Sequence, residues 1–139
     1  MKSVETFNFT VAAPKLGIAS LSPLVPLALW TTERKVTATG LLDTGSAVNV
    51  LPYRLGVDLG GDWKKEATIF RLTGNLARLE AKPLIVHAGV GAFKPVRLSF
   101  AWVKSDDVPM ILGQTNFFME FDVCFFRSKA TFEIRPKTS

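Results

Sequence analysis

The sequence predicts a single all-β domain, and three observations lead to this fold class. Apolar and polar residues alternate with a period of two in many short segments, the pattern of strands with one buried face. Turn-forming residues recur between these segments, for example at 105–109 and 127–130. The chain has 139 residues, which suits one domain, and many short strands at this spacing are typical of a barrel or a sandwich.

The alternating segments can be placed in order along the chain. Residues 1–20 are expected to form an extra N-terminal strand or arm, in which Phe7, Phe9 and Val11 share one face. Residues 21–139 are expected to form the main domain. From the same alternation, its strands are predicted at residues 35–42, 77–82, 96–102 and 131–135.

Only two segments have a sequence that could be helical. Residues 53–59 are short and interrupted by a glycine. Residues 114–121 contain Thr115 and Asn116, either of which could cap a helix of one or two turns. We therefore expect one short helix, near the C-terminus.

The composition limits the partners of the chain. Apolar residues make up 47% of it and 11 residues are phenylalanine, an excess that an interface between subunits could bury. The net charge of +5 is mild and no run of Lys or Arg exceeds two residues, so nucleic acid is not an expected partner. Pro23 and Pro26 interrupt the longest uncharged run, residues 16–32, so no membrane-spanning helix is expected.

The single cysteine and the single histidine bear on the cellular compartment and on metal binding. Cys124 is the single cysteine, which fits a reducing compartment and predicts a cytoplasmic protein. Its strand-like neighbours predict a buried, inert thiol. His87, the single histidine, has no further ligand at metal-binding spacing, so we expect a structural histidine and no metal site.

The segment "TGLLDTGSAVNVLP", residues 39–52, places a carboxylate directly after an apolar strand. A lone buried carboxylate is costly unless a partner compensates it, so Asp43 at a strand end needs an explanation. Thr44 adds a hydroxyl, and Gly45 would let the backbone turn tightly and approach another chain. Far downstream, "MILG" ends an apolar strand with Gly113.

The segments "LLDTGSAVNVLP", "MILGQTNFFMEFDV" and "CFFRSKATFEIRP", in this order, resemble the retropepsin-like aspartic proteases, above all the single-domain cellular and bacterial relatives of the retroviral enzymes. The resemblance covers residues 23–136 and implies a closed β-barrel that works as a two-fold homodimer without a cofactor. It implies that Asp43 is catalytic, that Thr44 interlocks the two active-site loops, and that Gly45 contacts the substrate backbone. It also implies that Ile111, Leu112 and Gly113 brace the loop.

The resemblance further implies that the hairpin of residues 67–82 covers the substrate as a flap. Candidate substrate-binding residues are those of the flap and those beside the catalytic loop: Ala47, Val48, Ile69, Phe70, Thr73, Gly74, Asn75 and Leu76. Ser46 is expected to donate a hydrogen bond to Asp43, which would favour the ionised carboxylate and an acidic pH optimum.

The expected activity is that of an aspartic endopeptidase acting on a peptide or protein substrate. This chemistry needs two carboxylates that share one proton, one acting as base and the other as acid. The chain contains one Asp-Thr-Gly, so the second carboxylate must come from a second copy across a two-fold axis. Two alternatives remain open: a catalytically inactive dimerisation or peptide-binding module of the same fold, and a barrel that binds nucleic acid through its basic surface.

Overall fold

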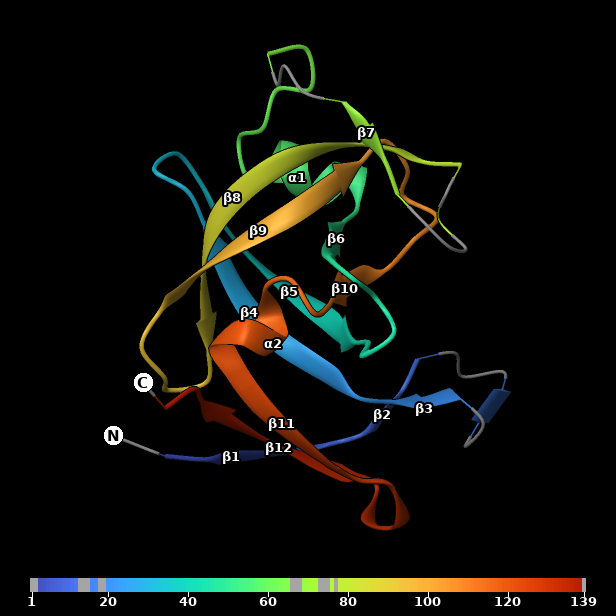
Figure 1. Cartoon of the computed structure of the whole chain (residues 1–139), viewed down its shortest axis with the longest axis vertical. Coiled ribbons are helices and arrows are strands. Elements are labelled where there is room, and N and C mark those ends of the chain that lie inside the picture. Colours follow the sequence, from blue (N-terminus) through green and yellow to red (C-terminus); the bar gives the residue numbers. More distant parts are fainter. Residues whose placement is uncertain are drawn as a thin grey trace.

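The computed structural model describes residues 3–12, 16–17, 20–65, 69–72, 76 and 78–138 (Figure 1). Strands dominate, which confirms the all-β class. The centre of the molecule is a closed ring of six strands, in which each pairs with the next and the last pairs with the first. In ring order these strands are β4 (Leu24–Trp30), β5 (Lys35–Leu42), β10 (Met110–Leu112), β6 (Asn49–Leu51), β9 (Val96–Val103) and β8 (Glu80–Val90).

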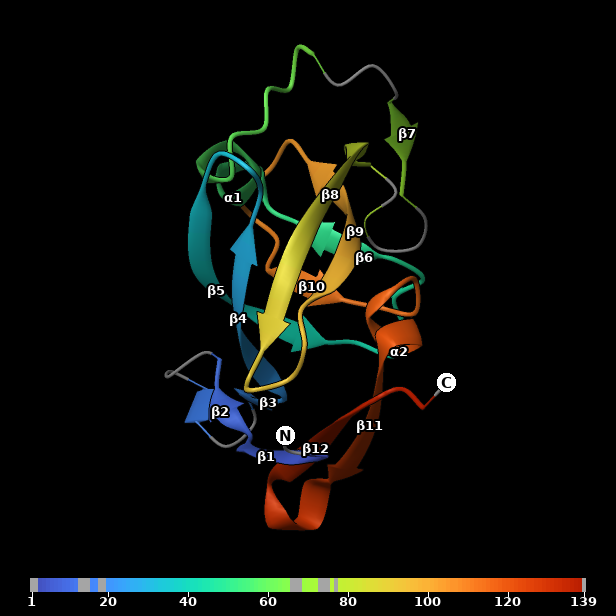
Figure 2. The same cartoon turned by 90° about the vertical axis from the view of Figure 1, so that its left-hand side faces the viewer.

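The ring combines antiparallel and parallel pairs. β4 with β5, β8 with β9 and β4 with β8 are antiparallel, so the barrel wall is built mainly from hairpins. β10 lies parallel to β5 and antiparallel to β6, and β6 lies parallel to β9. The short strands β10 and β6 therefore join the two ends of the wall and bring distant parts of the chain together (Figure 2).

A second sheet lies below the barrel in the view of Figure 1. It has the order β1 (Glu5–Asn8), β12 (Thr131–Pro136), β11 (Phe121–Phe126), and a 3-10 turn at Arg127–Lys129 joins β11 to β12. The expected N-terminal strand is thus present and pairs with the C-terminal strand. A small ladder joins β2 (Thr10–Val11) to β3 (Leu21–Ser22). The proposed division of the chain after residue 20 stays a prediction.

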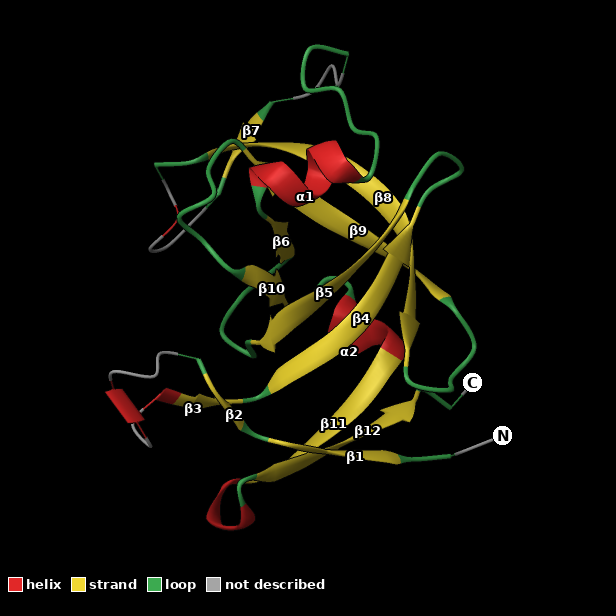
Figure 3. Ribbon diagram, turned by 180° about the vertical axis from the view of Figure 1, so that it is seen from behind, coloured by secondary structure: helices red, strands yellow, loops and turns green. Residues whose placement is uncertain are grey.

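The described residues contain two short α-helices, so the expectation of one was wrong. Both are labelled in Figure 3, in which the 3-10 turns are also red. α2 (Phe117–Glu120) is the predicted C-terminal helix. α1 (Tyr53–Asp58) contains Gly56, and the Trp102 ring lies against the helix at this glycine. A Cβ atom on Gly56 would come within 2.1 Å of Trp102 Nε1, and that nitrogen donates a hydrogen bond of 3.0 Å to the Tyr53 carbonyl oxygen. No helix of the described part is long and apolar enough to cross a membrane.

Two apolar clusters fill the molecule. The larger occupies the barrel and extends onto the second sheet, with buried residues such as Leu29, Trp102 and Phe132. The smaller lies on the other side of β10 and contains Val50 and Ile111. β10 thus separates the clusters, with Met110 and Leu112 facing the large one and Ile111 facing the small one, as the period of two requires.

Candidate active site

Asp43 directly follows β5, at the edge of the barrel interior. Leu42, the last residue of β5, is buried, whereas Asp43 is partly buried. The neighbouring strand β10 runs parallel to β5, and the Leu112 carbonyl oxygen accepts a hydrogen bond of 3.0 Å from the Asp43 backbone N–H. The backbone of Asp43 is therefore fixed by β10, the strand that the sequence predicts as its brace.

The residues after Asp43 form a tight turn around its carboxylate. The Gly45 N–H donates to Asp43 Oδ1 at 2.9 Å, and the Ser46 N–H donates to the Asp43 carbonyl oxygen at 3.1 Å. A hydrogen bond from a backbone N–H to a carboxylate is charge-assisted and limits the side-chain rotamer. One oxygen of Asp43 is thus held in place by its own loop.

The structure corrects two expectations about this loop. The Ser46 hydroxyl donates to the Val48 carbonyl oxygen at 2.7 Å, and because it has a single hydrogen it does not donate to Asp43. Gly45 was expected to permit a tight turn through its conformational freedom, but it is not among the described glycines with positive φ. The turn is instead closed by the two hydrogen bonds to Asp43.

Gly113 is the glycine that this site requires for steric reasons. A Cβ atom at this position would lie 2.3 Å from the Val48 carbonyl oxygen and 2.7 Å from that of Ser46. Both are backbone atoms of the loop that follows Asp43, and they cannot move aside like the end of a side chain. The absence of a side chain at Gly113 therefore lets the β10–α2 segment pass directly against the Asp43 loop.

Further hydrogen bonds join the two segments beyond Gly113. The Gln114 N–H donates to the Ser46 carbonyl oxygen and the Thr115 N–H to that of Ala47, each at 2.9 Å. The Gln114 side-chain amide donates from Nε2 to the Thr44 carbonyl oxygen at 2.8 Å. Asn49, fully buried, accepts from the Gly113 N–H at 2.8 Å.

Sequence reasoning missed Asn49 and Gln114. Asn49 carried a signal, because it is a polar residue within the apolar run Val48–Leu51. No local sequence pattern pointed to Gln114, since its hydrogen-bond partner lies 70 residues away in the chain.

Thr44 presents its side chain to solvent in the single chain. It is exposed, and its hydroxyl makes no hydrogen bond within the part of the chain that the structure describes. Its carbonyl oxygen, in contrast, is held by Gln114. The hydroxyl is therefore free for a partner, and its expected role in joining two loops stays a prediction.

The structure brings together some of the predicted substrate-binding residues. Val48 and Leu76 both pack against the small apolar cluster that contains Ile111. Ala47 is exposed beside them. Within the predicted flap segment, β7 (Phe70–Arg71) pairs with the start of β8, and Ile69 and Phe70 are 52% and 37% exposed. The predicted tip residues Thr73, Gly74 and Asn75 lie outside the described residues.

Other predicted features lie away from this site. No group of three or more His, Cys, Asp or Glu side chains that could hold a metal is found among the described residues. His87 is exposed on β8 and stacks on Trp30, with ring centroids 5.9 Å apart. Cys124 is exposed, not buried as expected, because β11 is an edge strand and Cys124 is on its open face.

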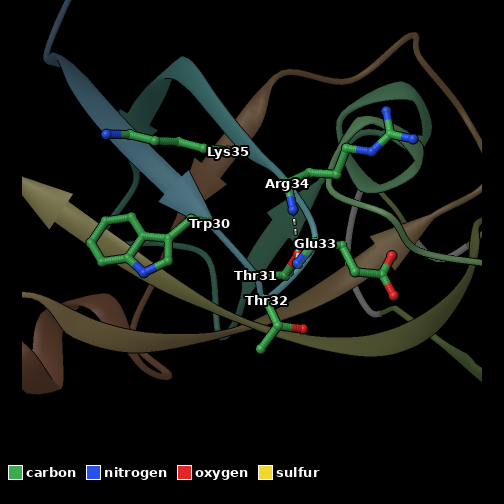
Figure 4. Close-up of a pocket in the computed structure, with 6 residues that line it drawn as sticks. All are labelled: Trp30, Thr31, Thr32, Glu33, Arg34 and Lys35. Atoms are coloured by element: carbon green, nitrogen blue, oxygen red, sulfur yellow. Dashed lines mark hydrogen bonds between the residues drawn. The ribbon is translucent and has the colours of Figure 1, made fainter.

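A hollow of about 420 Å³ lies at the turn between β4 and β5 (Figure 4). It is lined by Trp30, Thr31, Thr32, Glu33, Arg34 and Lys35. This turn precedes β5, whereas Asp43 follows the other end of the same strand. The hollow is therefore formed by one hairpin and does not belong to the candidate active site.

Comparison with known proteins shows a similarity of structure and none of sequence. No family model matches the chain, and no curated protein sequence matches it. Among solved structures, it is similar to the crystal structure of a retropepsin-like aspartic protease from Rickettsia conorii, with a TM-score of 0.67 and 16% sequence identity. The alignment covers 96% of this chain and 92% of that one. The chain therefore has the fold of a retropepsin-like aspartic protease over nearly its whole length.

Proposed function

We propose that this chain is an aspartic endopeptidase whose active site forms between two copies of the chain, with Asp43 of each copy as a catalytic residue. The observation that carries the proposal is the set of hydrogen bonds that joins the Asp43 loop to the β10–α2 segment. Hydrogen bonds hold both the Asp43 backbone and one of its carboxylate oxygens. A carboxylate delivered by a fixed loop at a barrel strand end suits chemistry that needs exact placement.

The proposed mechanism uses two Asp43 carboxyl groups that share one proton. The ionised carboxylate removes a proton from a water molecule, whose oxygen attacks the carbonyl carbon of the peptide. The protonated carboxyl group donates its proton to the carbonyl oxygen, which gives a neutral tetrahedral diol. Collapse of the diol breaks the C–N bond. The carboxyl group that took the water proton donates it to the leaving amine, and the other carboxylate takes a proton from a hydroxyl group of the diol, so the pair again shares one proton.

Two observations support a homodimer. The first is the exposed Thr44 hydroxyl beside Asp43, which has no hydrogen-bond partner within the described residues. The second is β11, which pairs only with β12 among the described strands and so leaves one edge open. This edge strand contains neither proline nor lysine, and Phe125 on it is 38% exposed. An open apolar edge of this kind favours pairing with another chain.

The substrate is proposed to be an extended peptide held between the flap and the catalytic loop. A peptide in this conformation can pair with β-structure through its main chain while alternate side chains enter apolar pockets. Val48 and Leu76 are suited to line such a pocket, because both already pack at the edge of the small apolar cluster. Ile69 and Phe70 add exposed apolar surface on the flap side.

The proposal is tested by incubating the purified protein with a mixed peptide library over a range of pH and identifying new termini by mass spectrometry. The wild type should cleave peptides, and Asp43→Asn should lose at least about 100-fold of that activity. A peptide mimic with a central hydroxyl in place of the scissile bond should bind the wild type and inhibit it. Cleavage that survives in Asp43→Asn, or no cleavage at any pH together with no binding of the mimic, contradicts the proposal.

A further inference from the structure

Asn49 is a polar residue that the structure buries completely, at 0% exposure. Its side-chain amide uses all of its hydrogen-bonding groups. Oδ1 accepts from the Gly113 N–H at 2.8 Å and from the Phe117 N–H at 3.4 Å. Nδ2 donates to the Ser99 carbonyl oxygen at 3.1 Å and to Asn116 Oδ1 at 3.0 Å. Two donors and two acceptor sites are what an amide side chain offers, so a side chain without an amide cannot make all four contacts.

These contacts join three parts of the barrel. Ser99 lies on β9, Gly113 directly follows β10, and Phe117 is the first residue of α2. The N–H groups of a first helical turn lack partners within the helix, and Asn116, at the cap position of α2, makes no capping hydrogen bond. Asn49 thus caps α2 from β6.

Asn116 extends the network to β9. It accepts from the Ser99 N–H at 2.9 Å and donates from Nδ2 to the Arg97 carbonyl oxygen at 2.8 Å. The pair of asparagine side chains therefore fixes the β10–α2 segment against the barrel wall.

The network reaches Asp43 through this same segment. Leu112, next to Gly113, accepts the hydrogen bond from the Asp43 N–H, and Gln114, on the other side, holds Thr44 and Ser46. Asn49 contacts neither the Asp43 side chain nor its backbone in any recorded hydrogen bond. The hydrogen bonds of its side chain therefore connect to Asp43 through residues 112–114.

We infer that Asn49 is a positioning residue: its buried amide fixes the β10–α2 segment, and that segment sets the position of the Asp43 loop. The expected loss of activity rests on the proposed function, whereas the structural role of Asn49 does not depend on it. A misplacement of about 1 Å in a reacting group can cost on the order of 100-fold in rate. Loss of the amide should therefore lower kcat more than it raises KM, because the substrate pockets do not include Asn49.

The experiment compares two variants at position 49 with a matched core variant. Asn49→Ala removes all four hydrogen bonds. Asn49→Asp keeps the shape and the acceptor for the Gly113 N–H, and when its carboxyl group is protonated it regains one donor. Leu29→Ala is the control, because Leu29 is fully buried in the barrel and near the β4–β5 turn, at the opposite end of that hairpin from Asp43. Each is assayed at a temperature at which melting curves show it folded.

Amide hydrogen exchange of Asp43 gives a readout that does not depend on activity. In Asn49→Ala this amide should exchange at least about 10-fold faster than in the wild type, and in Leu29→Ala it should not, since local opening and global stability are separable in this measurement. Equal exchange rates in Asn49→Ala and wild type would overturn the inference.

Kinetics give the second readout. In Asn49→Ala, kcat should fall by about 10- to 100-fold with KM within about threefold of wild type. In Asn49→Asp, the ratio of its kcat to that of wild type should rise as the pH falls, because the protonated carboxyl group restores one donor. Unchanged kcat in Asn49→Ala, or a loss equal to that of Leu29→Ala, overturns the inference and leaves the proposed function standing. If the wild type cleaves nothing, the proposed function fails and the exchange measurement alone decides the inference.

Discussion

The proposed catalytic floor and the proposed flap are built in different ways. The floor, defined here as residues 43–49 and 112–117, is a pair of segments joined by four backbone hydrogen bonds and by the side chains of Asn49 and Gln114. The flap, defined as β7 and the start of β8, is a ladder of two residue pairs, Phe70 with Ala81 and Arg71 with Glu80. One further bond, from the Leu72 N–H to the Leu79 carbonyl oxygen, is long at 3.4 Å.

This difference fits the two tasks proposed above for the floor and the flap. A reacting carboxylate must stay in one position, and the floor supplies buried polar contacts whose loss would be costly. An element that covers a substrate has to open and close, and such elements come from the less stable parts of a fold. A substitution in the floor should therefore change stability, whereas one in the flap should change substrate binding.

The largest effect is expected from Gly113→Ala in the floor. The added methyl group would meet the backbone oxygens of Ser46 and Val48, so the two segments must separate. The free energy of unfolding should fall by about 2–4 kcal/mol, measured by chemical denaturation. The matched control is Gly45→Ala, where the nearest atom is a movable Asp43 oxygen at 3.3 Å and the loss should stay below about 1 kcal/mol. Similar losses in both variants would show that the floor is not tightly packed at Gly113.

A smaller effect is expected from Thr44, which lies in the floor but is proposed to act between two chains. Thr44→Val should weaken the dimer by about 1–3 kcal/mol per site, because a buried partner would lose its hydrogen bond. Thr44→Ser keeps the hydroxyl and should retain most of the dimer affinity. Sedimentation equilibrium measures the dimer affinity of both variants. Equal affinities would contradict the proposal that the Thr44 hydroxyl joins the two active-site loops.

Ser46→Ala should cost about 0.5–1.5 kcal/mol of stability, the value of one hydrogen bond. Because the hydroxyl donates to Val48 and not to Asp43, the pH profile of activity should keep the shape of the wild-type profile. Ser22→Ala is the control, since it removes a similar short-range bond, from Ser22 Oγ to the Ser20 carbonyl oxygen at 2.9 Å, outside the floor. A shifted pH optimum in Ser46→Ala alone would mean that the hydroxyl turns to Asp43 in the working enzyme.

The smallest effect on stability is expected in the flap. Ile69 is 52% exposed, so Ile69→Thr, which keeps the branched shape, should change the free energy of unfolding by less than about 0.5 kcal/mol. If Ile69 contacts substrate, KM should rise while kcat stays unchanged. A stability loss as large as that of Gly113→Ala would remove the distinction between flap and floor.

Much of the fold could be predicted because the barrel strands keep one buried face. β5 and β9 were placed closely by the alternation alone. β4 was not among the predicted strands, and it contains Pro26, a residue that is rare in central strands. The structure explains the exception: β8 pairs only with residues 27–30 of β4, so Pro26 has a neighbouring strand on one side. That arrangement depends on the closure of the barrel, which no local pattern reveals.

The candidate site was predictable where it depends on short motifs. Asp43 and the run Ile111–Gly113 were found in this way, and the structure places them side by side. Asn49 and Gln114 were not found, because their partners lie 64 and 70 residues away and the choice of partner depends on the tertiary fold. The Ser46 hydroxyl was assigned to the wrong acceptor, since the carbonyl oxygen of Val48 comes within reach only after the loop turns back.

The central claim is that the active site needs Asp43 from two chains, and subunit mixing tests it directly. Wild type and Asp43→Asn are mixed in equal amounts, and mass-tagged chains confirm complete exchange. Random pairing gives about one quarter wild-type dimers, one half mixed dimers and one quarter mutant dimers. Because a mixed dimer has one carboxylate and one amide and cannot relay the proton, activity per wild-type chain should fall to about half. Unchanged activity per wild-type chain after complete exchange would place the whole catalytic site within one chain and contradict the account.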